Sequence, residues 1–291
     1  MEYNKNNQID LHIHSNASDG TLSPSEIIDL AIKLNLGAIS ITDHDTIEGI
    51  KDVLSIELPN HLKFITGVEI STDPPENFSF KGSFHILGYG INIDNQELNE
   101  KLTLLKNARK DRNPQIIKKL NDLGVDITLE EIKKEEGIDA QIGRPHIAKL
   151  IIKKGYAKSI NEVFDKYIGK GKPAYVDKFR IECSKVIELI NNAGGIAVLA
   201  HPILLNIDKD TLAKLVSVMV NMGLKGIEVY YPDHSEDKMI DYKDIADKFG
   251  LLITGGTDFH GALKPDIKMA YGYGNMLIPY ELYEKLTNAL L

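Results

Sequence analysis

The chain has 291 residues, of which 43% are hydrophobic and 26% are charged, and its formal net charge is −8. This composition predicts a globular protein with a sizeable core, and no apolar run approaches the roughly 20 residues that a membrane-spanning helix needs. Residues 1–7 are polar and lack the apolar region of a signal peptide, and the single cysteine, Cys183, excludes an internal disulfide, so we expect a reducing cytoplasm.

The charge is unevenly distributed along the chain. Residues 101–180 contain 19 Lys/Arg and 11 Asp/Glu, a balance of +8, which leaves 15 Lys/Arg and 31 Asp/Glu, a balance of −16, for the rest. A basic middle segment in an acidic chain indicates that this segment approaches an anionic ligand. The alternative is a set of lysine-rich helices that face solvent.

The first predicted strand carries two histidines on one side. Apolar and polar residues alternate over residues 9–14, and side chains two apart on a strand point the same way. His12 and His14 therefore project together, and Asp19 lies in the loop that follows. Two imidazoles at a strand end can hold a metal ion. The alternative is a pair of solvent-facing histidines on an edge strand.

Helices and strands alternate through the first part of the chain. Ser23 is the expected cap of a helix that begins at Pro24, with Glu26 completing a capping box. Further strands are predicted over residues 38–42, 64–70 and 84–89. This order predicts an α/β fold with a mostly parallel sheet or barrel, in which functional residues gather where strands end. The polar residues at those ends are His12, His14, Asp43, His44, Glu69 and His85.

The middle of the chain loses the strand pattern. We predict a helix over residues 97–123 with a break at Asn113–Pro114, a helix capped by Thr128 and Glu131, and helices that begin near residues 144 and 160. Because this segment is helical and basic, we expect residues 97–183 to form a helical insertion domain for substrate and phosphate recognition. Residues 1–96 and 184–291 would form the body.

The α/β pattern then resumes. Strands are predicted over residues 195–200, 226–230 and 251–256, and a final helix over about 280–290. The first of these strands ends at His201, the second contains Glu228, and the third leads into Asp258 and His260.

Nine residues at or near the predicted strand ends form a candidate metal cluster. They are His12, His14, Asp19, His44, Glu69, His85, His201, Asp258 and His260. Imidazole together with carboxylate suits Zn, Mn or Fe, whereas carboxylates alone favour Mg or Ca. Nine ligands exceed the capacity of one ion and fit two or three ions that share a bridging carboxylate. The absence of thiolates excludes a finger-type structural zinc, and clustered ions can activate water and clamp the oxygens of a phosphoryl group.

These motifs resemble those of the PHP (polymerase and histidinol phosphatase) superfamily, in the family's order and over residues 9–260. The matching stretches are His12-Ile13-His14 with Asp19, Thr42-Asp43-His44, Gly67-Val68-Glu69, His85, Ala200-His201-Pro202 and Asp258-Phe259-His260. The resemblance implies a distorted (β/α)7 TIM-like barrel with a trinuclear metal site, where a metal-bound hydroxide does the chemistry.

The resemblance also implies how the ligands divide among the ions. One ion would bind His12, His14, Glu69 and Asp258. Glu69 would bridge to a second ion, completed by His85 and His201. A third would bind Asp19, His44 and His260.

Gly143-Arg144-Pro145-His146 resembles the phosphate-binding signature of a PHP subgroup that includes nucleoside 3′,5′-bisphosphate phosphatases and 5′-to-3′ exonucleases acting on short RNA. Arg144 offers a planar fork to a phosphate, and a helix N-terminus adds amide donors. The alternative for Arg144 is an ion pair with a local acid. We expect His146 and His234 to contact phosphate as well, although His234 fits an ordinary loop histidine equally, and Tyr175 to pack or to stack on a base.

We therefore predict a metal-dependent phosphoesterase that binds two or three divalent ions, drawn from Mn, Zn, Fe or Mg, and acts on small nucleotides or short RNA. Long duplex nucleic acid and membranes are not expected partners. Two alternatives remain open: a histidinol-phosphate phosphatase, and a non-catalytic PHP module whose metals serve a regulatory or structural role.

Overall fold

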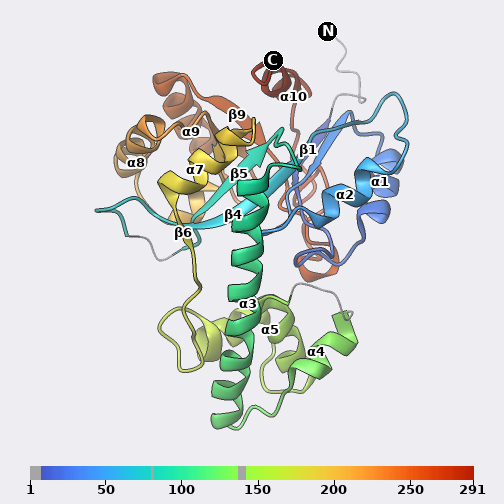
Figure 1. The fold of residues 1–291 in the computed structure, drawn as a ribbon, viewed down its shortest axis with the longest axis vertical. Coiled ribbons are helices and arrows are strands. Elements are labelled where there is room, and N and C mark those ends of the chain that lie inside the picture. The colour runs from blue at the N-terminus through green and yellow to red at the C-terminus, as the bar shows by residue number, and fades with distance from the viewer. Residues whose placement is uncertain (1–7, 80–81, 137–141) are drawn as a thin grey trace.

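The computed structural model describes residues 8–79, 82–136 and 142–291, so the polar start at residues 1–7 lies outside the described part. The strands and most helices form an α/β body, and the lower half of α3 with α4 and α5 forms a helical unit below it (Figure 1). The helices α7, α8 and α9 lie on one side of the strands, and α1 and α2 lie on the other (Figure 1).

The strands are β1 (Ile9–Ile13), β2 (Ala38–Ile41), β3 (Lys63–Phe64), β4 (Gly67–Asp73), β5 (His85–Tyr89), β6 (Ile181–Glu182), β7 (Ile196–Leu199), β8 (Gly226–Tyr230) and β9 (Leu252–Gly255). The α-helices are α1 (Pro24–Lys33), α2 (Glu48–Leu54), α3 (Gln96–Asp122), α4 (Leu129–Glu136), α5 (Arg144–Lys153), α6 (Ile160–Val163), α7 (Cys183–Asn192), α8 (Lys209–Asn221), α9 (Glu236–Phe249) and α10 (Glu281–Asn288). A π-helical turn, Phe164–Ile168, continues α6.

The strands form a parallel three-stranded sheet and a mixed six-stranded sheet. One has the order β1-β2-β3 and the other β6-β4-β5-β7-β8-β9. The neighbours are parallel as predicted, except that β5 runs antiparallel to both β4 and β7. A parallel pair needs a long crossover connection, usually a helix. The described residues between β4 and β5 contain no helix, so the chain turns back and β5 runs antiparallel to β4.

Isolated bridges connect the two sheets at the ends that carry the candidate ligands. Ile13 on β1 pairs with Phe259 beyond β9, and His44 beyond β2 pairs with Glu69 on β4. The carboxyl ends of β1, β2 and β9 and the middle of β4 therefore lie close together. This arrangement brings residues from both ends of the chain to one place.

The helical segment has a hydrophobic core of its own. Sixteen buried residues between Ile116 and Ala174 form this core, separate from the clusters that pack around the sheets. The helix α3 contributes to both: Leu98, Leu102 and Leu105 pack with the body, and Ile116 and Leu120 pack within the helical segment. The helix thus passes from one core into the other.

The predicted break at Asn113–Pro114 is wrong, because α3 is continuous through Pro114. A proline in a helix removes one backbone hydrogen bond and disturbs the preceding turn. Here the flanking Asn113 is buried and its amide donates to the Ile142 carbonyl at 2.8 Å, and Ile116 is buried in the helical core. Tertiary packing therefore compensates for the proline.

The helix starts that the sequence predicted are confirmed. Ser23 and Glu26 form the capping box of α1, and Thr128 and Glu131 make the same reciprocal bonds at α4. The predicted strand at residues 64–70 is two strands, β3 and β4. None of the helices in the described ranges combines the length and the apolar composition needed to cross a bilayer.

Candidate metal centre

The two histidines of β1 face the interior. The side chains of His12 and His14 are fully buried, as are the apolar residues that alternate with them. Buried hydrophobic clusters cover the side of β1 that carries Ile9, Leu11 and Ile13, and the histidines project toward the other predicted ligands. The alternative of solvent-facing histidines on an edge strand is therefore excluded.

Glu69 lies at the middle of the candidate ligands. Its carboxylate oxygens lie within 3.3 Å of a ring nitrogen from each of five histidines. The distances are 3.3 Å to His12, 3.2 Å to His14, 3.0 Å to His44, 2.7 Å to His85 and 2.8 Å to His201. A carboxylate in contact with five imidazoles has the geometry of a bridging ligand.

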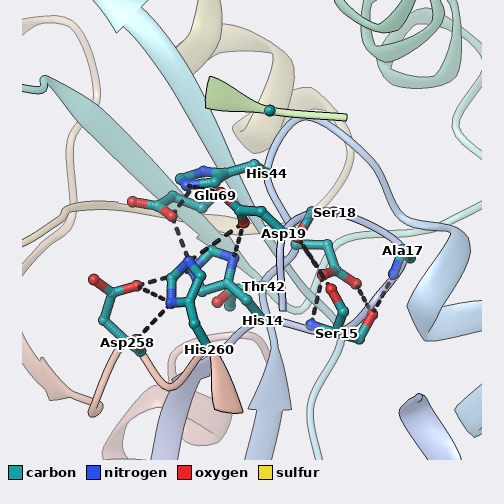
Figure 2. Close-up of polar contacts among 12 residues, drawn as sticks. His14, Ser15, Ala17, Ser18, Asp19, Thr42, His44, Glu69, Asp258 and His260 are labelled. Atoms are coloured by element: carbon teal, nitrogen blue, oxygen red, sulfur yellow. Dashed lines mark hydrogen bonds and ion pairs between the residues drawn. The ribbon is translucent and has the colours of Figure 1, made fainter. Parts of the chain in front are cut away.

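The remaining carboxylates complete the cluster. Asp258 Oδ1 lies 3.1 Å from His14 Nε2, and Asp19 Oδ1 lies 3.3 Å from His260 Nε2. Figure 2 shows the imidazoles of His14, His44 and His260 pointing toward the three carboxylates. All nine residues singled out from the sequence thus lie in one cluster.

Three overlapping groups of side chains in this cluster have the spacing of metal sites. They are His12, His14, Glu69 and Asp258; His14, Asp19, His44 and His260; and His44, Glu69 and His85. The first matches a ligand set implied by the family resemblance, and the second matches another with His14 added. The family resemblance also implies a set of Glu69, His85 and His201. In the structure, His201 Nε2 lies 3.3 Å from His85 Nδ1.

Unpaired polar atoms indicate that these residues fit metal ions. Among the described residues, His12 Nε2, both ring nitrogens of His14, Glu69 Oε2 and Asp19 Oδ1 are buried without a hydrogen-bond partner. Buried polar atoms without partners cost free energy, so a cluster of them requires an explanation. The ligand atoms of these residues are imidazole nitrogens and carboxylate oxygens that lie close together. Zn, Mn and Fe sites use this combination of donors.

The charges of the cluster favour cations. Burial by itself raises the pKa of Glu69, but the imidazoles of His44, His85 and His12 outweigh it and hold that pKa well below its usual range. Burial also raises the pKa of Asp258, but Lys264 and His260 outweigh it and lower that pKa well below its usual range. For Asp19, His44 and His260 outweigh burial and lower the pKa in the same way. The three carboxylates are therefore ionised at neutral pH.

Neighbouring groups hold the ligands in place. The Asp43 carboxylate accepts hydrogen bonds from the Ser15 N–H (2.8 Å) and hydroxyl (2.6 Å) and from the Ser18 hydroxyl (2.6 Å), which fixes the loop that carries Asp19. Ser15 and Ser18 belong to that loop (Figure 2). Glu228 contacts His12 Nδ1 at 2.9 Å and accepts from the His201 N–H at 2.7 Å.

Other supporting residues have no sequence signal. Tyr231 donates its hydroxyl proton to Asp258 Oδ2 at 3.1 Å, and the Lys264 ammonium contacts the same oxygen at 2.6 Å. Asp10 is fully buried and accepts from the Thr257 and Ala270 N–H groups, which ties β1 to the loop that carries Asp258. Tertiary contact alone identifies these residues.

Two ligands adopt unusual backbone conformations. His201 has φ of +24° and Asp258 has φ of +52°, in the left-handed region that non-glycine residues rarely occupy. Such conformations cost free energy and persist where surrounding contacts impose them, which they commonly do at functional sites. His201 comes two residues after β7 and Asp258 three residues after β9, so the unusual backbone conformation orients a candidate ligand just beyond a strand end.

A cavity of about 450 Å³ extends from the metal cluster into the helical segment. Asp19, His44 and His85 line one end, and six cationic side chains line the rest: Arg109, Arg112, Arg144, Lys170, Lys178 and Arg180. Three of these have carboxylate partners: Arg109 and Lys178 contact Asp45, and Arg180 contacts Asp73 and Asp177. In the described part of the chain, Arg112, Arg144 and Lys170 make no ion pair.

The structure places Arg144 in this cavity and His146 and His234 outside its lining. The Arg144 guanidinium lies over the rings of Phe164 and Tyr175, 5.2 and 5.9 Å from their centroids, and donates to the Ile168 carbonyl at 3.2 Å. His146 is buried and its Nδ1 accepts from the Gly143 N–H, which caps α5.

His234 is buried in the body. Its Nδ1 contacts the Val229 carbonyl at 2.8 Å, and its ring lies beside those of Tyr231 and Tyr242. Tyr175 packs against Arg144, and its hydroxyl donates to Asp177 at 2.8 Å.

Arg112 is the cavity residue that the sequence analysis missed. Its side chain is only 5% exposed, and among the described residues its Nε and Nη1 have no hydrogen-bond partner. Burial, with repulsion from Arg144 and Arg109, lowers its pKa to about 10. The available signal was a pair of arginines three apart on one face of a predicted helix, in the basic part of the chain.

Comparisons with known proteins agree with this geometry. The PHP domain family matches residues 10–261. The chain is 31% identical over 252 residues to a 3′,5′-nucleoside bisphosphate phosphatase of Chromobacterium violaceum, which covers 87% of each protein. It is 32% identical over 251 residues to a 5′-3′ exoribonuclease of Haemophilus influenzae, which covers 86% of this chain and 89% of the relative.

Solved structures give the same result. The crystal structure of a candidate metal-dependent phosphoesterase from Bifidobacterium adolescentis matches with a TM-score of 0.82 at 26% identity, covering 96% of this chain and 95% of the other. That of an amidohydrolase from C. violaceum with bound sulfate matches with a TM-score of 0.79 at 31% identity, covering 88% of each. The chain therefore belongs to the PHP domain family and is an enzyme of the metal-dependent phosphoesterase class.

Proposed function

We propose that the protein hydrolyses phosphate esters of nucleoside 3′,5′-bisphosphates and of short RNA. The observation that carries this proposal is Arg112, a buried guanidinium without a carboxylate partner in the described structure, in a cavity continuous with the metal cluster. An uncompensated buried charge is costly and requires a ligand of opposite charge. A second phosphate on the substrate supplies that charge.

The nine cluster residues would hold two or three divalent ions, divided as the sequence analysis expects. When bound, such ions activate water and neutralise the charge that develops on a phosphoryl group. Glu228 and Asp43 orient the side chains and the loop that would hold them. Mn, Zn, Fe and Mg all suit the imidazole and carboxylate donors to differing degrees.

The residues of the helical segment bind and orient the substrate in this proposal. Arg112 and Arg144 would bind the phosphate that is not cleaved, and contacts with the rings of Phe164 and Tyr175 orient the Arg144 guanidinium. His146 would act through its cap on α5, which keeps Arg144 at the cavity.

The architecture proposed with this function is a distorted (β/α)7 barrel, residues 1–96 and 184–291, with residues 97–183 inserted. The two isolated bridges between the sheets and the separate core of the helical segment support it. The single cysteine, which allows no internal disulfide, supports a reducing, cytoplasmic location.

The test is phosphate release from adenosine 3′,5′-bisphosphate by the Mn²⁺-loaded protein, with histidinol phosphate as the comparison substrate. We expect turnover of the bisphosphate and little of histidinol phosphate, which has no second phosphate. Preference for histidinol phosphate would support that alternative, and two or more bound ions by elemental analysis without any turnover would support a non-catalytic module.

A variant refines the test. Arg144→Ala should raise KM for the bisphosphate more than it lowers hydrolysis of p-nitrophenyl phosphate, because only the first substrate offers a second phosphate. Equal loss on both substrates would contradict the role of Arg144.

A further inference from the structure

Asp45 joins the helical insertion to the metal cluster. It directly follows the ligand His44, is fully buried, and its N–H donates to the Glu69 carbonyl at 2.9 Å. Its φ of +57° lies in the left-handed region, which aspartate tolerates better than most residues. The backbone of Asp45 is therefore fixed against two residues of the metal cluster.

The Asp45 carboxylate contacts both segments that connect the body to the insertion. Its Oδ2 accepts from Arg109 Nη2 at 2.6 Å and from Lys178 Nζ at 2.7 Å, and its Oδ1 accepts from the Ser71 N–H at 2.9 Å. Arg109 lies on α3, which leads into the helical segment, and Lys178 lies on the segment that returns to β6. A single carboxylate thus ties the outgoing and returning segments to the metal-ligand loop.

This tie determines where the cavity cations lie. Arg112 is one helical turn beyond Arg109 on α3, and it lines the same cavity as Arg144 and the ligand His44. The contact with Asp45 holds Arg109, and with it this part of α3, against the loop that carries His44, in addition to the packing of the start of α3 on the body core. Asp45 therefore contributes to the separation between the metal cluster and the cavity cations.

We propose that Asp45 is a positioning residue that sets the substrate specificity of the enzyme. It fixes the distance between the metal cluster and the Arg112–Arg144 pair, and so selects phosphate esters that carry a second phosphate at a defined separation. This inference rests on the proposed function and adds to it the residue that fixes the spacing. A purely structural role for Asp45 makes a different prediction, equal loss of activity on every substrate.

Asp43 provides a matched control. Asp43 and Asp45 flank His44 and both are buried. Asp43 bonds to Ser15 and Ser18 of the body, whereas Asp45 bonds to the insertion. Asp45→Asn and Asp43→Asn therefore make the same chemical change on either side of one ligand. Only Asp45→Asn weakens the contacts of the carboxylate with the insertion.

The experiment measures kcat/KM of the full-length, Mn²⁺-loaded protein for adenosine 3′,5′-bisphosphate and for p-nitrophenyl phosphate. In Asp45→Asn the ratio of the two values should fall by about tenfold or more, mainly through KM for the bisphosphate, because charge-assisted contacts are lost. In Asp43→Asn the ratio should stay within about threefold of the wild type, although both rates fall, since it disturbs only the ligand loop. An unchanged ratio in Asp45→Asn, or an equal fall in both variants, overturns the proposal.

A milder pair of variants covers the case in which Asp45→Asn does not fold. Lys178→Met removes one cation and leaves Asp45 paired with Arg109, and Lys170→Met removes a cavity cation that makes no ion pair in the described structure. The ratio of kcat/KM for the bisphosphate to kcat/KM for p-nitrophenyl phosphate should fall about threefold further in Lys178→Met than in Lys170→Met. Of these two lysines, Lys178 is the one that contacts Asp45. Equal effects overturn the proposal. A wild-type protein that hydrolyses neither substrate refutes the proposed function itself, whereas a wild-type preference that Asp45→Asn retains refutes only this inference.

Discussion

The metal cluster and the cationic cavity beside it are built from different kinds of residue. The cluster gathers histidines and acids at the strand ends of the body, and all nine were recognisable in the sequence. The cavity gathers arginines and lysines from the helical segment, of which only Arg144 was recognised. Rare residue types in fixed motifs identify a site from sequence, whereas common surface residues do so only when the fold buries them.

The two regions also differ in how their charges are balanced. Each carboxylate of the cluster faces several imidazoles, so acidic groups and nitrogen donors lie together there. In the cavity, Asp45 neutralises Arg109 and Lys178, and Arg112 is left without a carboxylate in the described structure. Under the proposed function, the substrate supplies the balance in the cavity. Variants in each region can separate chemistry from recognition.

The largest expected effect comes from Glu69, the residue that five histidines contact. Glu69→Ala should lower kcat on both the bisphosphate and p-nitrophenyl phosphate by more than the roughly 10- to 100-fold that loss of an outer partner of a metal ligand costs. Bound metal, measured by elemental analysis, should fall with it. His61→Ala changes an exposed histidine and serves as the control. Full metal content with full activity in Glu69→Ala would remove Glu69 from the metal site.

Arg112 gives the next largest effect and confines it to one substrate. Arg112→Met should lower kcat/KM for the bisphosphate by about 10- to 100-fold, because a charge-assisted contact is lost. The melting temperature should stay the same or rise, since the substitution removes a buried cation that its neighbours repel. Arg180→Met, at a cation already paired with Asp73 and Asp177, should change the kinetics less. A lower melting temperature with unchanged kinetics would make Arg112 a structural residue.

Glu228 tests the support of the cluster. Glu228→Gln weakens the contact with His12 and should reduce metal affinity by about 10- to 100-fold. The loss of activity should then be recovered at high Mn²⁺ concentration and should be the same for both substrates. Activity that excess metal does not restore would assign Glu228 a role beyond orienting His12.

The smallest effect is a pH dependence of recognition. Burial, partly offset by Asp45, lowers the pKa of Lys178 to about 8, below its unfolded value of 10.5. Lys178 therefore loses its charge as pH rises through about 8, and KM for the bisphosphate should increase severalfold more than KM for p-nitrophenyl phosphate. Lys178→Arg should abolish this difference, because arginine stays charged.

The same shift affects stability with a definite sign. Between pH 8 and 10.5 the unfolded chain binds a proton at Lys178 that the folded chain has released, so this group makes folding more favourable as pH rises. Urea titrations across this range, compared with Lys178→Arg, measure the contribution. An arginine variant with the same pH dependence of stability would assign the effect to another group.

Local sequence rules determined the individual elements of this protein. The serine cap with Glu26 begins α1, alternation defines β1, and histidines at strand ends identify the candidate ligands, because each signal depends on neighbours in the chain. These rules failed at Pro114, where packing of α3 overrides a local helix breaker. They predicted β5 as a strand but left its direction open, because that direction depends on its connection. The family motifs carried most of the prediction of the metal site.

Only the tertiary structure decided how the two regions meet. Asp45 contacts Arg109 and Lys178, which are 64 and 133 positions further along the chain. Arg112 is buried because α3 passes from the body core into the helical core. Nothing near Asp45 along the chain predicts its distant partners, and the pair of arginines on α3 indicates a shared helix face without predicting that Arg112 is buried. Charge balance and burial depend on which segments the fold brings together, and a carboxylate or a guanidinium acquires its role from those distant partners.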